Sequence, residues 1–101
     1  MSRVIGIDLG TTNSCVAVLD EKGARVLAGH DGERTTPSWV SWGPDNAITV
    51  GARARRQAVT NAAATIYGTK RLIGRKVNAD DVAAFARVAP FRIVAAPNGD
   101  T

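Results

Sequence analysis

The sequence predicts a mixed α/β protein that begins as a β-meander and continues with helices and a further strand. Three observations predict this class. Apolar residues alternate with a period of two over residues 4–9, turn-rich segments separate further β-branched runs, and Ala, Arg and Gln dominate after residue 51. With 101 residues, 45% of them hydrophobic and 22% charged, the chain has a globular balance and enough length for one modest core.

Five segments have the alternating or β-branched pattern of strands. They are residues 4–9, 14–20, 25–28, 39–42 and 48–50. In the first, Ile5, Ile7 and Leu9 share one face. The polar loop at residues 10–13 joins the first two strands as a hairpin, and residues 29–37 carry the glycines and proline of a surface loop.

The second half of the chain predicts three helices, which cover residues 52–59, 65–73 and 80–87. Thr65 is the expected N-cap of the second helix, Gly74 its end and Asn78 the cap of the third. A last strand is predicted over residues 91–95, and Asn98-Gly99 after it is typical of a type I′ hairpin turn. Because no return strand follows this turn, we expect residues 1–101 to be part of a longer domain.

Charge and cysteine content restrict the partners and the compartment. Thirteen Lys and Arg against nine Asp and Glu give a formal charge of +4. The basic residues cluster, which leaves open a small nucleic-acid-binding module formed by Arg53, Arg55, Arg56, Arg75 and Lys76, although a solvated face is the simpler interpretation. No apolar run approaches the ~20 residues of a membrane helix. The single cysteine, Cys15, has no internal disulfide partner, so we expect a cytoplasmic protein.

Asp8 is the first residue that could carry chemistry. A carboxylate near the end of an apolar strand is costly unless something satisfies it. Gly6 and Gly10 flank Asp8 on the same face and leave room for a ligand or a hydrated cation. An aspartate that caps its own turn is the alternative interpretation.

The loop Gly10-Thr11-Thr12-Asn13 could hold phosphate through successive backbone N–H groups and two hydroxyls. The chain lacks both GxxxxGK[ST] and GxGxxG, so a nucleotide site here would be of another kind. Hairpins also use Gly, Thr and Asn simply to turn, and this alternative stays open.

Lys70 is the third candidate. On the helix expected at residues 65–73, Ile66, Lys70 and Ile73 follow at i, i+4 and i+7, so the ammonium would leave from an apolar stripe. A lysine placed in this way either extends to water or reaches a buried anion. Beside a phosphate loop, it would stabilise the charge that develops on a transferring phosphoryl group.

Four segments of the chain resemble, in order and spacing, the start of the DnaK-type seventy-kilodalton heat-shock chaperones. They are Ile5-Gly6-Ile7-Asp8-Leu9-Gly10-Thr11-Thr12-Asn13-Ser14, Arg34-Thr35-Thr36-Pro37-Ser38, Gln57-Ala58-Val59-Thr60-Asn61 and Lys70-Arg71-Leu72-Ile73-Gly74-Arg75. Sugar kinases of the same actin-like superfamily have a loop similar to the first segment, and a fragment of such a kinase is a further alternative. The four segments together are specific for the chaperones.

The resemblance implies a partial actin-like, ribonuclease-H-like ATPase lobe that binds ATP or ADP with Mg2+. On this likeness, the first phosphate loop is formed by Gly10, Thr11, Thr12 and Asn13. Asp8 matches the carboxylate that holds magnesium through water. Lys70 and Thr11 match catalytic residues, and the lysine orients the attacking water. The tripeptide Tyr67-Gly68-Thr69 departs from the family, and Gly68 is expected to loosen the helix by about 1 kcal/mol relative to Ala.

The resemblance also implies partners and a division of labour. In the family, ATP hydrolysis switches a separate domain that grips unfolded polypeptides and so assists protein folding under stress, with J-domain co-chaperones and nucleotide-exchange factors. Residues 1–101 would then be the N-terminal portion of the nucleotide-binding domain and hold about half of a catalytic site. We expect such a chain to bind nucleotide weakly and to have no ATPase activity alone, because phosphoryl transfer needs groups positioned from several sides.

Overall fold

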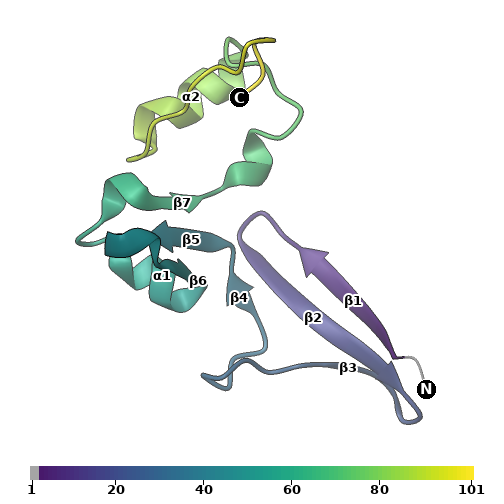
Figure 1. Ribbon diagram of the computed structural model, residues 1–101. Coiled ribbons are helices and arrows are strands. Elements are labelled where there is room, and N and C mark those ends of the chain that lie inside the picture. Colours follow the sequence, from purple (N-terminus) through teal and green to yellow (C-terminus); the bar gives the residue numbers. More distant parts are fainter. Residues whose placement is uncertain (1–2) are drawn as a thin grey trace.

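The computed structural model describes residues 3–101, which form two antiparallel sheets followed by a helical segment (Figure 1). The strands are β1 (Val4–Leu9), β2 (Asn13–Asp20), β3 (Gly23–Val26), β4 (Thr36–Pro37), β5 (Trp39–Trp42), β6 (Ile48–Val50) and β7 (Thr65–Tyr67). The helices are α1 (Ala52–Gln57) and α2 (Asp80–Val88), and the 3-10 turns are η1 (Pro44–Asn46), η2 (Ala62–Ala64) and η3 (Thr69–Arg71). The predicted α/β class is confirmed.

The first sheet has the strand order β1-β2-β3, and the short β4 also pairs with β2. The register of the β1–β2 hairpin places Ile7 opposite Val16 and Asp8 opposite Cys15. The third strand lies over Gly23–Val26 rather than over residues 25–28, because a two-residue turn closes the β2–β3 hairpin at Asp20 and Gly23. The φ of Gly23 is 105°, a left-handed value that favours glycine at this turn.

The second sheet has the order β6-β5-β7 and carries α1 against it (Figure 1). Trp39 on β5 stacks on Tyr67 of the neighbouring β7, with ring centroids 4.2 Å apart. Ala54 of α1 is fully buried. The two sheets meet where β4 leads into β5, and the tip of the β1–β2 hairpin lies near this junction (Figure 1).

The helix predicted over residues 65–73 is wrong. Residues Thr65–Tyr67 form β7, Gly68 adopts a left-handed conformation with φ 65°, and Thr69–Arg71 form only one 3-10 turn. A β-branched pair followed by an aromatic residue suits a strand that pairs with β5, and this pairing outweighs the helical spacing. Thr65 is therefore no N-cap: its side chain is buried between the strands.

The C-terminal predictions are confirmed only in part. Helix α2 forms as expected, but Ala79 is its N-cap and Asn78 makes no capping bond. Residues 91–95 form no strand. The turn at Asn98-Gly99 is closed by a bond from the Gly99 N–H to the Ala96 carbonyl, and φ is positive at Gly99 but not at Asn98. This conformation is a type I turn followed by a left-handed glycine, rather than type I′.

The core is small. Within residues 3–101, the hydrophobic core consists of the buried side chains of Ala54, Val82, Phe85 and Phe91. Both faces of β1 are open, and Ile5, Ile7 and Leu9 are each at least 58% exposed. The radius of gyration is 16.4 Å, against about 13 Å for a compact domain of this length. No helix within residues 3–101 is long and apolar enough to cross a membrane.

Candidate functional site

The loop between β1 and β2 is a tight turn whose conformation requires glycine at its first position. A Cβ atom on Gly10 would lie 2.0 Å from the Asn13 carbonyl oxygen, so any side chain there would force the backbone to move. At Gly6, by contrast, a Cβ atom would meet nothing within 4 Å. Gly10 therefore shapes the turn, while Gly6 leaves the face that it shares with Asp8 open. Thr11, Thr12 and Asn13 are exposed.

Ser38, which lies between β4 and β5, supports this loop, and we did not predict a role for it. Its hydroxyl donates to the Gly10 carbonyl at 2.7 Å, and its N–H donates to the Thr12 carbonyl at 2.9 Å. Ser14, the first residue after the loop, contacts the same hydroxyl at 2.9 Å. The one signal in the sequence is that Ser38 belongs to the second of the four family-like segments.

Lys70 meets the loop, although not by the route predicted. Its ammonium donates a hydrogen bond to the carbonyl of Leu9, the residue directly before Gly10. The expected apolar stripe of Ile66, Lys70 and Ile73 does not exist, since Ile66 lies on β7 and Lys70 on η3. The tertiary fold thus brings together residues 61 positions apart in the sequence.

Gly68 is the turning point that leads the chain from β7 into the Lys70 segment. Its φ of 65° is left-handed, and it is buried against Phe85, whose ring atom Cζ would lie 3.1 Å from a Cβ on Gly68. Phe85 also makes edge-to-face contacts with Tyr67 and Phe91, and the Arg71 guanidinium lies 5.4 Å from its ring centre. The prediction that Gly68 loosens a helix is wrong, because it forms a fixed turn anchored by aromatic rings.

Asp8 lies on β1, two residues before the loop, with its side chain exposed. Its carboxylate makes no hydrogen bond or ion pair within residues 3–101, so it is available to a ligand. The same residues contain no group of three His, Cys, Asp or Glu side chains that could hold a metal directly. A single exposed carboxylate fits Mg2+ that keeps much of its water shell and takes further oxygen ligands from phosphate.

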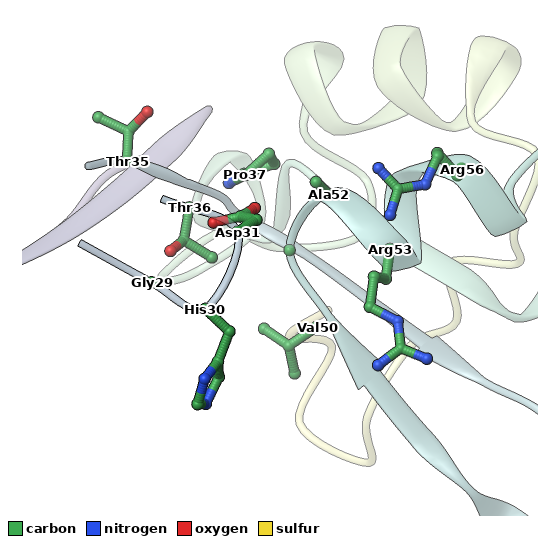
Figure 2. Close-up of a pocket in the computed structure, with 11 residues that line it drawn as sticks. Gly29, His30, Asp31, Thr35, Thr36, Pro37, Val50, Ala52, Arg53 and Arg56 are labelled. Atoms are coloured by element: carbon green, nitrogen blue, oxygen red, sulfur yellow. The ribbon is translucent and has the colours of Figure 1, made fainter. Parts of the chain in front are cut away.

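The α1 arginines line two adjoining cavities, and Arg56 lines both. One, of about 420 Å³, lies between α1 and the segment before β4; Arg53 and Arg56 approach it from α1, and His30 and Thr35 from the opposite segment (Figure 2). A neighbouring cavity of about 460 Å³ includes Asn13 and Arg55 in its lining. None of the three ion pairs formed within residues 3–101 involves an α1 arginine.

Two carboxyl groups away from the loop have lowered pKa values. The Arg25 side chain, 3.0 Å from Asp20, is the main cause of the lowered pKa of that carboxyl, and the Lys22 N–H adds to it. Hydrogen bonds from Lys76 and then from Asn98 lower the pKa of Asp100. Both pairs fasten turns, at the β2–β3 hairpin and at the C-terminal turn, so these shifts mark local structure rather than a catalytic group.

Comparison with protein-family models assigns the class of protein to which the chain belongs. An ATPase lobe of the actin-like type is implied by a match to the family model described as Hsp70 protein, which covers residues 4–101. The chain belongs to the Hsp70 family, whose members are chaperones that bind ATP. This is the family that the four segments indicated, rather than the sugar kinases that share the first loop.

Proposed function

We propose that this chain is the N-terminal portion of the nucleotide-binding domain of an Hsp70-type chaperone, with the first phosphate loop at residues 10–13 and the catalytic lysine at Lys70. The contact between the Lys70 ammonium and the Leu9 carbonyl carries the proposal, because it holds a cation at the entrance of a loop rich in backbone N–H groups. The open apolar faces of β1 support it too, since a strand this apolar is ordinarily covered by further structure.

Each residue has a stated role in this proposal. The N–H groups of the loop and the Thr11 and Thr12 hydroxyls bind the β- and γ-phosphates of ATP. Lys70 releases the Leu9 carbonyl when phosphate is present, because an ammonium binds a charged oxygen more strongly than a neutral one. It then steadies the γ-phosphate and orients the attacking water. Thr11, at the centre of the loop, is the second catalytic residue.

Asp8 would hold Mg2+ through water molecules, and the ion would neutralise charge on the phosphates. The carboxylate suits this role because it is exposed, lies on the open face beside Gly6 and precedes the loop by two residues. Groups on the far side of a nucleotide are needed for turnover, so the chain by itself is proposed to bind MgATP weakly and to be inactive.

In the complete protein, ATP hydrolysis at this site would control the affinity of a peptide-binding domain for unfolded polypeptides. J-domain co-chaperones and nucleotide-exchange factors would act as partners, as in the family. This wider activity is proposed from membership of the family alone.

The test is a titration of the isotope-labelled chain with millimolar MgATP, followed by backbone amide NMR. We expect shifts at residues 10–13 and at Lys70. Lys70→Ala should weaken binding about tenfold, the order expected for a hydrogen bond to a charged group, whereas Lys76→Ala is the matched control and should leave it unchanged. Shifts confined to residues 53–56 would instead favour the basic nucleic-acid-binding module. Absence of any shift at residues 10–13 would overturn the proposed site.

A further inference from the structure

Ser38 contacts the phosphate loop through both its hydroxyl and its backbone. Its single hydroxyl hydrogen goes to the Gly10 carbonyl, at 2.7 Å, so in the 2.9 Å contact with Ser14 the donor must be Ser14. Its N–H goes to the Thr12 carbonyl. Two of the loop's carbonyl groups are therefore turned towards one residue that lies outside the loop.

These contacts also fix the direction of two N–H groups. No peptide bond within residues 3–101 is cis, and in a planar trans peptide the C=O and the following N–H point in opposite directions. With the Gly10 and Thr12 carbonyls turned towards Ser38, the N–H groups of Thr11 and Asn13 point away from it. The Thr11 N–H has no acceptor within the described part of the chain.

We propose that Ser38 is a positioning residue of the phosphate loop, which presents the Thr11 and Asn13 N–H groups to a phosphate before it binds. The inference rests on the proposed function, because it takes phosphate to be the ligand of the loop. Two donors fixed in advance lose little freedom when the anion arrives, and this is the usual source of affinity in preorganised sites.

The position of Ser38 is itself held by the fold. Pro37 before it is buried and stands opposite Asn13 in the β2–β4 pairing. The proline ring restricts its own φ, so the chain enters Ser38 along a fixed path. The bond from the Ser38 N–H does not depend on its side chain, whereas the bond to Gly10 does. Loss of the hydroxyl should therefore release the Thr11 N–H and leave the Asn13 N–H in place.

The test compares MgATP titrations of the parent chain, Ser38→Ala, Ser38→Thr and Ser14→Ala by amide NMR. We expect Ser38→Ala to bind about two- to tenfold more weakly, as for the loss of one hydrogen bond. Its ATP-induced shift should fall at Thr11 more than at Asn13, a difference that general destabilisation would not produce. Ser38→Thr keeps the hydroxyl and should restore binding. Ser14→Ala leaves the Gly10 bond intact and should bind as the parent does.

The outcomes separate this inference from the proposed function. If the parent chain shows no shift at residues 10–13, the proposed function fails. If the parent binds and Ser38→Ala binds equally well with the Thr11 shift unchanged, the role of Ser38 is refuted while the phosphate loop stands. Should Ser38→Ala fail to fold, Ser38→Cys keeps the size of the side chain with a weaker donor. Weaker binding and a reduced Thr11 shift in that variant support the role, and parent-like binding overturns it.

Discussion

A buried hydrogen-bond chain between β5 and β7 holds the strand that leads to Lys70. Ser41 and Thr65 are 0% and 1% exposed, and their hydroxyl oxygens are 2.9 Å apart. Thr65 donates to the Asn61 carbonyl at 2.8 Å, which uses its only hydroxyl hydrogen, so Ser41 is the donor to Thr65. The Asn61 side-chain amide donates in turn to Ser41 at 3.3 Å and to the Trp42 carbonyl at 2.8 Å.

The directions of these hydrogen bonds predict that substitutions at Thr65 and Ser41 lower the free energy of unfolding by different amounts. Thr65→Val keeps the shape of the side chain but leaves the buried Ser41 hydroxyl hydrogen without its acceptor, while the Asn61 carbonyl keeps only its bond from the Ala64 N–H. It should lower the free energy of unfolding by about 2 kcal/mol. Ser41→Ala should cost about 1 kcal/mol, because Thr65 keeps its acceptor and the Asn61 amide keeps Trp42. In the double variant no hydroxyl is left unpaired, so its cost should be close to that of Thr65→Val alone.

Urea unfolding of the parent and the three variants measures this double-mutant cycle. It is followed by tryptophan fluorescence, to which Trp39, stacked on Tyr67, and Trp42 both contribute. The expected coupling between the two positions is about 1 kcal/mol. Thr49→Val, on the half-buried side of β6, is a control for hydroxyl loss outside the chain of bonds. Additive costs, with the double variant equal to the sum of the single ones, would refute the assigned directions.

Three further predictions concern the turns. Gly68→Ala should destabilise the chain by about 1–2 kcal/mol in urea unfolding, and Gly68→Asn by less, because asparagine tolerates the left-handed region; equal costs would argue against the backbone explanation. Gly10→Ala should shift the amide signals of residues 10–13, whereas Gly6→Ala, where the added methyl meets nothing, should leave them unchanged; no shift in either variant would contradict the tight turn. The pKa of Asp100 is lowered below its ordinary 3.8, so the stability it contributes is present above that pH and is lost as the pH falls through the folded-state pKa. When the Gly99 amide signal is followed as the pH is lowered, part of its shift should come from protonation of Asp100. Asp100→Asn should abolish that part, and an unchanged pH profile of the signal would show that another group causes the shift.

Strands β1, β2, β5 and β6 and the α2 helix could be predicted because their signals are local. Alternation over residues 4–9 and the β-branched run of residues 14–20 follow from the period of two in a strand, and Lys22-Gly23 marks the turn between β2 and β3. The family-like segments identified the Hsp70 family in the same way, because residues of each segment are contiguous. None of these inferences needed to know which strands are neighbours.

The Lys70 segment shows where local signals fail. Its helical spacing was present in the sequence, but Thr65, Ile66 and Tyr67 gain more by pairing with β5, and the left-handed Gly68 then ends the strand. A strand partner 24 residues away contributes nothing to local periodicity. The same limitation applies to residues 91–95, where an alternating pattern finds no neighbouring strand within the described residues.

The sequence alone determined the residue types of the candidate site: a glycine-threonine loop, an aspartate before it and a lysine further on. The tertiary structure decided how they are arranged. It brings Lys70 to the Leu9 carbonyl across 61 residues and Ser38 to the Gly10 carbonyl across 28. Periodicity records only which face of its own element a residue occupies, whereas the direction of a loop's N–H groups depends on which distant residue binds the opposite carbonyls. For this reason the supporting role of Ser38 could be inferred only from the tertiary structure.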